Sequence, residues 1–251
     1  MRLTVVGCSG SIPGPESAAS CYLVEADGFA LVLDLGNGAL GPLQRYVDLT
    51  KIDTVLLSHL HADHCVDLTS LAVAIRYGPG RRQDPIPVLG PAGLAERIEE
   101  MHGVHDEAGA GDLRGALAFA EITEGSSTIG PFNVTARRVD HPVEAYAYRI
   151  EQDGRTLAFS GDCAPCPGLD EVTRGADLAL VEAAYVENPE NPPGLHHTGR
   201  EAGELATRVG AGRLVVTHVP PWHDPDAARA AAAAAFPGAV ELARPGASYE
   251  V

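Results

Sequence analysis

Basic side chains are scarce in this sequence. Lysine and arginine together number 18 against 34 aspartates and glutamates, the formal net charge is −16, and Lys51 is the only lysine among 251 residues. A surface that follows the phosphates of a nucleic acid requires clustered basic side chains, so no large nucleic-acid partner is expected. The acidic balance does not exclude a small anionic substrate, because bound divalent cations reverse the local charge of a site.

Long apolar segments are missing as well. No apolar run approaches the roughly 20 residues that cross a membrane, so no membrane partner is expected. The start at residues 1–6 has the pattern of a strand and lacks that of a signal peptide. The five cysteines are odd in number. Together these features predict reduced thiols and a cytoplasmic location.

Aromatic residues amount to only 5% of the sequence, whereas hydrophobic residues reach 45% and charged residues 21%. Valine, leucine, isoleucine and alanine must therefore fill the interior. The composition is ordinary for a globular enzyme, and the length is ample for a sizeable core. No linker stands out, so residues 1–251 are expected to form one domain.

The densest group of metal-binding side-chain types is the stretch 58–64, which reads Ser-His-Leu-His-Ala-Asp-His. It follows an apolar run at residues 55–57 that predicts a buried strand, and it precedes a helix-like pattern at residues 66–77. His59 and His61 share one face of an extended segment, so both imidazoles can reach one ion. The aspartate and the last histidine of the stretch lie where the chain turns, and they can reach a second ion. A solvated polar turn is the alternative interpretation.

Strand and helix patterns come in two runs, and helices follow the strands of each run. Strands are predicted at residues 3–6, 21–25, 29–33, 54–57, 87–89, 118–122, 132–139, 146–150, 156–159, 178–181, 214–217, 240–243 and 248–251. Helices are predicted at residues 39–46, 66–77, 92–101, 198–209 and 224–236. We therefore predict an α/β fold of four layers, an αββα sandwich in which two facing sheets carry helices on their outer sides.

The strongest candidate metal ligands all follow predicted apolar strands. They are His59, His61, Asp63, His64, His141, Asp162 and His218. Strand ends at one edge of a sandwich converge, and seven ligands suit two ions about 3.5–4 Å apart that share a carboxylate. His141 or His218 alone could equally be a core histidine, but the upstream motif favours ligation.

Three further features lie near these strand ends. Asp34 leaves a buried strand and is predicted to support the ligands from behind. The glycine-rich loop at residues 7–15 could bring backbone amides close to a phosphate, or be merely a turn, and Ser9 and Ser11 on it are tentative substrate contacts. Cys163 and Cys166 have CxxC spacing without a second pair, so we expect Cys163 to pack beside the metal site.

With these residues in place, the chain resembles the metallo-β-lactamase superfamily, whose hallmark is His-x-His-x-Asp-His. The resemblance implies the four-layer sandwich of that superfamily and two divalent ions, zinc first, with manganese or iron as alternatives. The ligand sets that it implies are His59, His61 and His141 for one ion, Asp63, His64 and His218 for the other, and Asp162 between them.

A second motif narrows the resemblance to the branch of RNase Z and the cyclic-nucleotide phosphodiesterases. Residues 196–200 read His-His-Thr-Gly-Arg and resemble the His-x-[Ser/Thr] motif of those enzymes. By that resemblance His196 leans towards the metal cleft, Thr198 caps a helix and Glu182 steadies the histidine. GCSGS near the start, LSHLHADHC and THVPPW look closest to bacterial cyclic-AMP phosphodiesterases of this fold.

One departure separates this chain from RNase Z. RNase Z carries a long tRNA-gripping arm between the histidine and the aspartate that correspond to His141 and Asp162. Here these two residues are too close in sequence for an arm, and the Asp153-Gly154 turn of a hairpin lies between them. Recognition of a small phosphodiester is therefore favoured.

The resemblance thus predicts a metal-dependent phosphodiesterase that hydrolyses small phosphodiesters, most directly 3′,5′-cyclic nucleotides such as cyclic AMP, through a metal-activated hydroxide. Asp63 would hold or deprotonate the nucleophile, and His196 would stabilise phosphoryl oxygens or protonate the leaving oxygen. Tyr185 and Trp222 are tentative contacts for a base, although rim packing explains them equally well. A homodimer is implied by the resemblance only. The alternatives are an RNase Z-like ribonuclease on short RNA, a lactone or thioester hydrolase, and a non-catalytic metal-binding protein.

Overall fold

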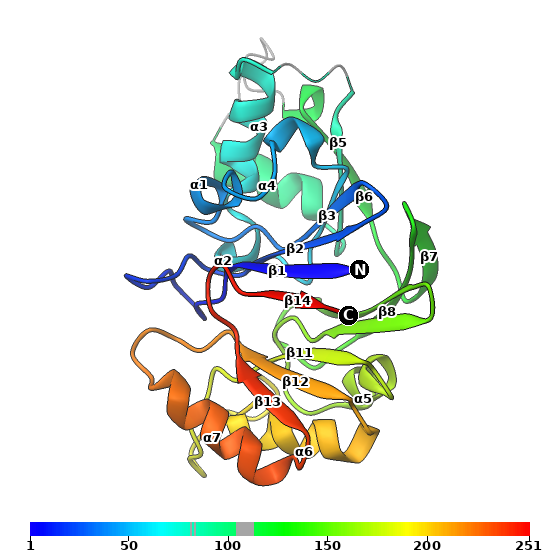
Figure 1. Ribbon diagram of the computed structural model, residues 1–251. Helices are drawn as coiled ribbons and strands as arrows, with labels where there is room; N and C mark the ends of the chain where they lie inside the picture. The colour runs from blue at the N-terminus through cyan, green and yellow to red at the C-terminus, as the bar shows by residue number, and fades with distance from the viewer. Residues whose placement is uncertain (81, 83, 104–112) are drawn as a thin grey trace.

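The computed structural model describes residues 1–80, 82, 84–103 and 113–251, and within them it contains two seven-stranded mixed sheets (Figure 1). The first sheet has the order β14-β1-β2-β3-β4-β5-β6. Its strands are β1 (Arg2–Gly7), β2 (Cys21–Ala26), β3 (Phe29–Leu33), β4 (Thr54–Leu56), β5 (Ile86–Gly90), β6 (Leu117–Glu121) and β14 (Ser248–Glu250). Strand β14 pairs antiparallel with β1, so the two chain termini lie side by side in Figure 1.

The second sheet has the order β13-β12-β11-β10-β9-β8-β7. Its strands are β7 (Gly125–Ile129), β8 (Phe132–Arg138), β9 (Tyr146–Gln152), β10 (Arg155–Phe159), β11 (Leu178–Glu182), β12 (Arg213–Thr217) and β13 (Ala239–Leu242). The helices are α1 (Leu40–Leu43), α2 (Ala62–Cys65), α3 (Leu68–Tyr77), α4 (Leu94–His102), α5 (Pro167–Thr173), α6 (Gly199–Val209) and α7 (Pro225–Ala235). Two short 3₁₀ turns lie at Leu49–Lys51 and Leu113–Gly115.

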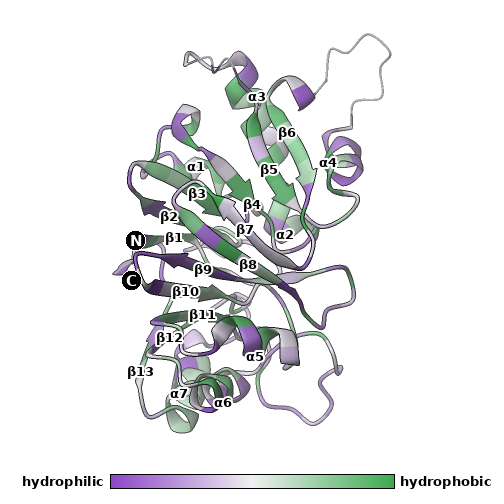
Figure 2. Ribbon diagram, turned by 90° about the vertical axis from the view of Figure 1, so that its right-hand side faces the viewer, coloured by the Kyte–Doolittle hydropathy of each residue, from purple (hydrophilic) through white to green (hydrophobic). Residues whose placement is uncertain are grey.

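Three apolar cores hold four layers together. Strand residues of the first sheet that point outward, such as Leu23 and Val55, pack with residues of α1 to α4, among them Leu71 and Ile98. Residues on the facing sides of both sheets form the central core, and a third core joins the second sheet to α5, α6 and α7. Figure 2 shows α3 and α4 on one side of the paired sheets and α5 to α7 on the other. The predicted αββα sandwich in a single domain is confirmed.

The few aromatic residues are concentrated in the central core. Tyr22 and Phe159 come from opposite sheets and place their ring centroids 5.3 Å apart. The two fully buried phenols of the described residues are satisfied, because the Tyr148 hydroxyl donates to the Leu57 carbonyl at 2.7 Å and the Tyr22 hydroxyl lies 2.7 Å from Thr217 Oγ1. These polar contacts fix the strand ends next to the stretch 58–64 and next to His218.

Several predicted boundaries were wrong. The predicted helix at residues 39–46 shortens to α1, which contains Pro42, and the pattern at 66–77 begins as a helix only at Leu68. The sequence interpretation missed β7 because its Gly-Ser-Ser-Thr-Ile sequence leaves four of its five residues exposed on an edge strand. It also missed the seven-residue helix α5, which has Pro167 in its first turn.

Within the described ranges, no helix is both long and apolar enough to cross a membrane. The five cysteines all lie in those ranges as free thiols, as predicted.

Candidate metal centre

Five strands deliver polar side chains to one edge of the paired sheets. Beyond β4 come His59 and His61, and the short helix α2 then carries Asp63 and His64. The other ligand candidates follow β8, β10 and β12, and they are His141, Asp162 and His218. Glu182 is the last residue of β11. The structure thus brings together all seven residues that the sequence marked as candidate ligands.

The first group consists of three imidazoles. His61 Nδ1 lies 3.0 Å from His59 Nε2 and 3.2 Å from His141 Nε2. Metal–nitrogen bonds of 2.0–2.1 Å in a tetrahedron separate two ligand atoms by about 3.3 Å. Two of the three nitrogen pairs therefore have the spacing that a single ion requires, and all three nitrogens lie within 4.8 Å of one another.

The second group contains two imidazoles and two carboxylates. His218 Nε2 lies 3.2 Å from His64 Nε2, 3.2 Å from Asp63 Oδ2 and 3.3 Å from Asp162 Oδ2. The same Asp162 oxygen lies 3.9 Å from His59 Nε2 of the first group. Asp162 is thus the carboxylate between the two groups.

The chemistry of the donors fits cations. Burial lowers the pKa of His59, His61 and His141, so these imidazoles are neutral and keep a lone pair for an ion. Burial raises the pKa of Asp162, but His218 and His64 outweigh it and hold the pKa well below its usual range. Asp162 Oδ1 is buried, lies 3.2 Å from His64 Nε2 and has no further partner within hydrogen-bond distance in the described residues. The cluster is therefore able to bind metal ions.

His64 is charged in the metal-free protein. Burial lowers its pKa, but Asp162 and Asp34 outweigh burial and raise the pKa well above the usual value. An ion bound by the second group must therefore displace a proton from His64 Nε2. Burial likewise raises the pKa of Asp63, and hydrogen bonds from His218 and His64 reverse this, so Asp63 is a carboxylate.

Asp34 holds His64 from behind. Its Oδ2 lies 2.7 Å from His64 Nδ1, and its Oδ1 accepts from the Ser58 backbone N–H at 2.7 Å. The Ser58 hydroxyl donates to Asp34 Oδ2 at 2.8 Å and lies 3.1 Å from His59 Nδ1. Because the Nδ1 atoms of both histidines are engaged, their Nε2 atoms face the cluster. Sequence reasoning assigned no role to Ser58, and its only signal was its place directly before His59.

Backbone contacts orient two further histidines. His141 Nδ1 donates to the Leu195 carbonyl at 3.0 Å, which leaves Nε2 for the cluster. His218 has a positive φ of 55°, and Gly10 packs so closely against it that a Cβ there would lie 2.3 Å from the His218 carbonyl oxygen. Neither Leu195 nor Gly10 could be singled out from sequence, because both act through backbone atoms or the absence of a side chain.

His196 lies beside both groups. Its ring centroid is 5.5 Å from that of His141 and 5.8 Å from that of His218. Its Nδ1 lies 2.8 Å from Glu182 Oε1. Burial lowers the pKa of His196, but Glu182 and Asp162 outweigh burial and raise it to about 9. The imidazole is therefore a cation at neutral pH in the metal-free protein.

Glu182 fixes this histidine in place, and Thr198 caps the helix that follows it. Both Glu182 oxygens also accept backbone N–H groups, from Cys163 and Ala184, each at 2.9 Å. Glu182, His196 and His218 have the spacing of a third metal group, but those contacts commit Glu182 to positioning His196. Thr198 Oγ1 accepts from the Glu201 backbone N–H at 3.2 Å and caps α6.

The tentative substrate contacts lie in different places. The Tyr185 ring stands edge-on to His196 with centroids 5.1 Å apart. The Ser11 backbone nitrogen is 3.4 Å from His218 Nε2, so Ser11 borders the cluster. Trp222 is 60% exposed, and its ring contacts His223. Ser9 is buried in a separate cavity whose lining includes none of the seven ligand candidates.

A cavity of about 610 Å³ opens beside His196 and Tyr185. Asp140 and Ala164, which neighbour the candidate ligands His141 and Asp162 in sequence, also line it. Cys163 is fully buried in the core under this region. None of the seven candidate ligands lines this cavity, but it has room for a molecule of a few rings in contact with His196.

Comparison with known proteins agrees with this geometry. A family model described as the beta-lactamase superfamily domain matches residues 30–219. The uncharacterized protein Rv1339 of Mycobacterium tuberculosis (strain ATCC 25618 / H37Rv) is 38% identical over 257 residues, which cover 100% of this chain and 92% of that protein. Ribonuclease Z of Mycobacterium marinum (strain ATCC BAA-535 / M) is 32% identical, with coverage of 96% and 95%.

The probable metallo-hydrolase YhfI of Bacillus subtilis (strain 168) is similar in both sequence and structure. It is 30% identical over the full length of both chains. Its crystal structure superposes with a TM-score of 0.89 and covers 100% of this chain and 99% of that one.

Proposed function

This chain belongs to the beta-lactamase superfamily and is a metal-dependent hydrolase, and from that premise we propose that it cleaves small phosphodiesters, most directly 3′,5′-cyclic nucleotides such as cyclic AMP. The proposal rests on one observation above all. His196 is held by Glu182 beside both groups of candidate metal ligands. Cleavage of a diester develops negative charge on phosphoryl oxygens, and a fixed hydrogen-bond donor stabilises that charge.

The candidate ligands can be assigned to two ions. His59, His61 and His141 would hold one ion, Asp63, His64 and His218 the other, and Asp162 would contact both. When bound, such ions lower the pKa of water and neutralise phosphate oxygens. Zinc, manganese and iron all accept these donors.

The chain's own residues supply the proton chemistry. Asp63 is a carboxylate in the cluster and can accept a proton or a hydrogen bond from the attacking water. His196 keeps its Nδ1 on Glu182, and in the described structure its Nε2 has no hydrogen-bond partner. That nitrogen is free to donate to a phosphoryl oxygen or to protonate the leaving 3′-oxygen.

The space around His196 supports a small substrate. The cavity of about 610 Å³ is lined by Tyr185 and by four acidic residues, with His196 and Arg200 as the basic side chains of its lining; the acidic residues are Asp140, Glu187, Glu201 and Glu204. An uncharged nucleoside portion suits such a lining better than a chain of further phosphates, because like charges repel.

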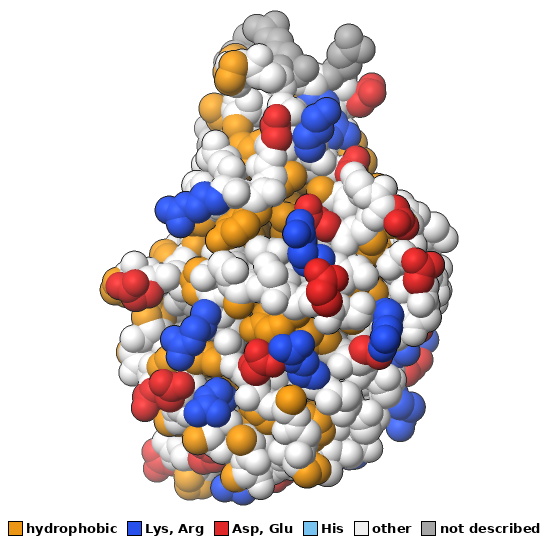
Figure 3. Space-filling model, viewed as in Figure 1, with side chains coloured by type: hydrophobic (Ala, Val, Ile, Leu, Met, Phe, Trp, Pro, Cys, Tyr) orange, Lys and Arg blue, Asp and Glu red, His pale blue; other side chains and the backbone are white. Residues whose placement is uncertain are grey.

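Cleavage of short RNA is the second candidate, favoured by the ribonuclease Z relatives. Against it, the residues between His141 and Asp162 form the β9–β10 hairpin and no projecting arm. On the face shown in Figure 3, basic side chains lie interspersed with acidic ones and form no continuous stripe.

A homodimer and a cytoplasmic location stay predictions.

Turnover by zinc- or manganese-loaded protein tests the proposal. We expect cleavage of cyclic AMP and of bis-p-nitrophenyl phosphate, and little cleavage of short RNA or a lactone. His196→Ala should keep both metals and lower kcat for the diesters by about 10²–10⁴-fold, because general acid catalysis is lost. His102→Ala, at the end of α4, is the matched control.

Each outcome discriminates between the candidate functions. Faster turnover of RNA than of cyclic AMP would favour the nuclease, and turnover of the lactone alone would favour carbonyl chemistry. Full diester cleavage by His196→Ala would remove His196 from the mechanism.

A further inference from the structure

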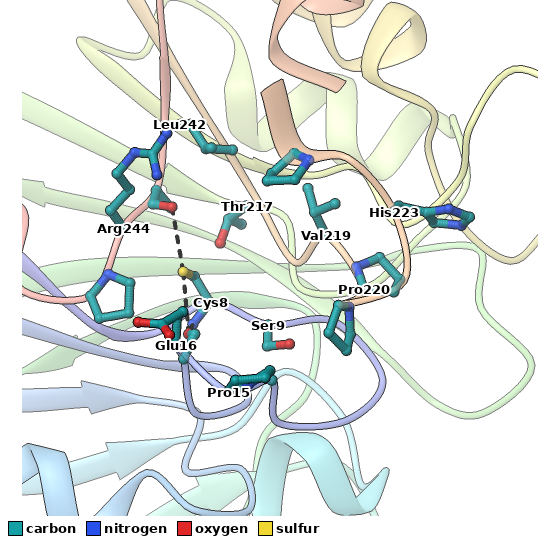
Figure 4. Close-up of a pocket in the computed structure, with 16 residues that line it drawn as sticks. Cys8, Ser9, Pro15, Glu16, Thr217, Val219, Pro220, His223, Leu242 and Arg244 are labelled. Atoms are coloured by element: carbon teal, nitrogen blue, oxygen red, sulfur yellow. Dashed lines mark hydrogen bonds between the residues drawn. The ribbon is translucent and has the colours of Figure 1, made fainter. Parts of the chain in front are cut away.

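A second cavity lies apart from the metal cluster, between the loop at residues 8–17, the segment 217–225 and the strand end at residues 242–245 (Figure 4). Its volume is about 260 Å³, and none of the seven candidate metal ligands lines it. We call it the proline cavity, because Pro15, Pro220, Pro221, Pro225 and Pro245 contribute to its lining.

The walls of the proline cavity are mostly apolar, and the prolines make them rigid. Proline rings have a fixed φ and little conformational freedom, so the cavity needs no ordering before it receives a ligand. An apolar cavity of about 150 Å³ is large enough for benzene. The proline cavity therefore has room for one aromatic ring with one or two substituents.

The hydroxyl group of Ser9 lines the cavity and can take part in a hydrogen bond. Ser9 is 5% exposed, and Figure 4 shows its hydroxyl pointing into the open space. The Ser9 hydroxyl makes no hydrogen bond within the described part of the chain. A ligand that fills the cavity removes water from this hydroxyl, so a ligand that exchanges a hydrogen bond with Ser9 is favoured.

Two charges lie at the rim, on the same side of the cavity in Figure 4. Arg244 offers a guanidinium, which Asp226 approaches only to 3.6 Å. The Glu16 carboxylate would repel a second negative charge on the ligand. The pair thus favours a ligand with a single negative charge over a phosphate.

We propose that the proline cavity is a second binding site, for a small aromatic acid with one negative charge. We also propose that a ligand bound there changes metal binding at the metal centre through His218. The ring lies among the prolines, the carboxylate faces Arg244, and a polar substituent meets Ser9. This site goes beyond the proposed phosphodiesterase activity and does not depend on it.

The link to the metal centre follows from shared backbone. Ser9 forms a bridge with Val219, and both residues line the cavity. The next residue, Gly10, donates its N–H to the Val219 carbonyl at 3.1 Å and packs against the His218 backbone. A ligand that presses on Ser9 and Val219 therefore acts on the two segments that hold His218.

Calorimetric titration of the metal-free full chain tests the site, because no ion can then capture a carboxylate. The probes are benzoate, the three hydroxybenzoates and benzylammonium. We expect benzoate and at least one hydroxybenzoate to bind and benzylammonium not to bind. Ser9→Ala should weaken that hydroxybenzoate about 2- to 10-fold and leave benzoate unchanged, and Arg244→Gln should weaken both about 2- to 5-fold.

Ser126→Ala on β7 and Arg155→Gln on β10 are the matched controls, and the melting temperatures of all variants establish folding. No binding of any acid at millimolar concentration, or binding that neither Ser9→Ala nor Arg244→Gln alters, would overturn the site. If the cavity is linked to His218, the affinity for the hydroxybenzoate must differ between metal-free protein and protein loaded with zinc. The zinc-loaded protein is measured with excess inorganic phosphate, so that phosphate rather than the carboxylate occupies the ions. Equal affinities would overturn that link.

Discussion

Replacement of Asp34 by asparagine tests how the second group of candidate ligands is held. Asp34 is fully buried and takes three hydrogen bonds, from Ser58 N, Ser58 Oγ and His64 Nδ1. An asparagine has only one acceptor oxygen, so its amide nitrogen must face a group that at present donates. Either Ser58 or His64 then loses its partner, or the His64 proton moves to Nε2, where it blocks an ion.

The magnitude follows from the contacts. One hydrogen bond to a charged group contributes about 1.5–3 kcal/mol, and about 1.4 kcal/mol corresponds to a factor of ten in affinity. We therefore expect Asp34→Asn to weaken metal binding at the second group by about 10- to 100-fold, in line with other residues that orient metal-bound histidines. Metal affinity at the first group should fall less, because Asp34 acts on that group only indirectly, through Ser58 and His59.

Competition with a chromophoric chelator measures both affinities. Asp53→Asn is the matched control, since Asp53 accepts the Ala30 backbone N–H at 2.8 Å in the same sheet, at the opposite ends of β3 and β4. If folded Asp34→Asn protein binds two ions as tightly as the control, Asp34 does not orient His64, and the assignment of the two groups must be revised.

Three further predictions concern the ions and α6. Removal of bound metal by a chelator should lower the melting temperature, because ligand at about 100 times its Kd stabilises the folded state by about 2.7 kcal/mol; calorimetry with and without added zinc measures this, and no shift would contradict a metal site. Affinity at the second group should rise with pH, by up to about tenfold per unit, because the raised pKa of His64 makes a proton compete with the ion; a pH-independent affinity in chelator competition would mean that His64 is not a ligand. Thr198→Ala should cost about 1 kcal/mol of unfolding free energy in urea, and Thr198→Ser should restore most of it, because the cap of α6 needs a hydroxyl; an unchanged midpoint for the alanine variant would contradict the cap.

The candidate ligands could be found from sequence because their chemistry is local. Two imidazoles two positions apart at the end of an apolar strand point to one side, whatever the rest of the chain does. The more distant partners, His141 and His218, needed the additional assumption that strand ends converge. The two sheets meet that assumption, because β8, β10, β11 and β12 all end at the edge where β4 ends.

The supporting contacts could not be found in this way. Leu195 holds His141 through a carbonyl, and Gly10 approaches His218 because it has no Cβ. Such roles leave no chemical signature in a residue's identity. The proline cavity has the same origin, since its prolines come from three separate segments that only the folded chain places together.

Backbone strain connects the fold to the site. Asp34 and His218 both adopt a positive φ, 56° and 55°, at the turns that follow β3 and β12. For residues other than glycine this conformation costs roughly 1–3 kcal/mol and persists only where surrounding contacts impose it. Glycine would relieve the strain at either turn, but it would remove the carboxylate that holds His64 or the imidazole that faces Asp162. The packing of the cores on both sides of the sheets therefore stabilises two strained turns. The side chains at these turns orient or form the cluster, which explains why the strain is retained.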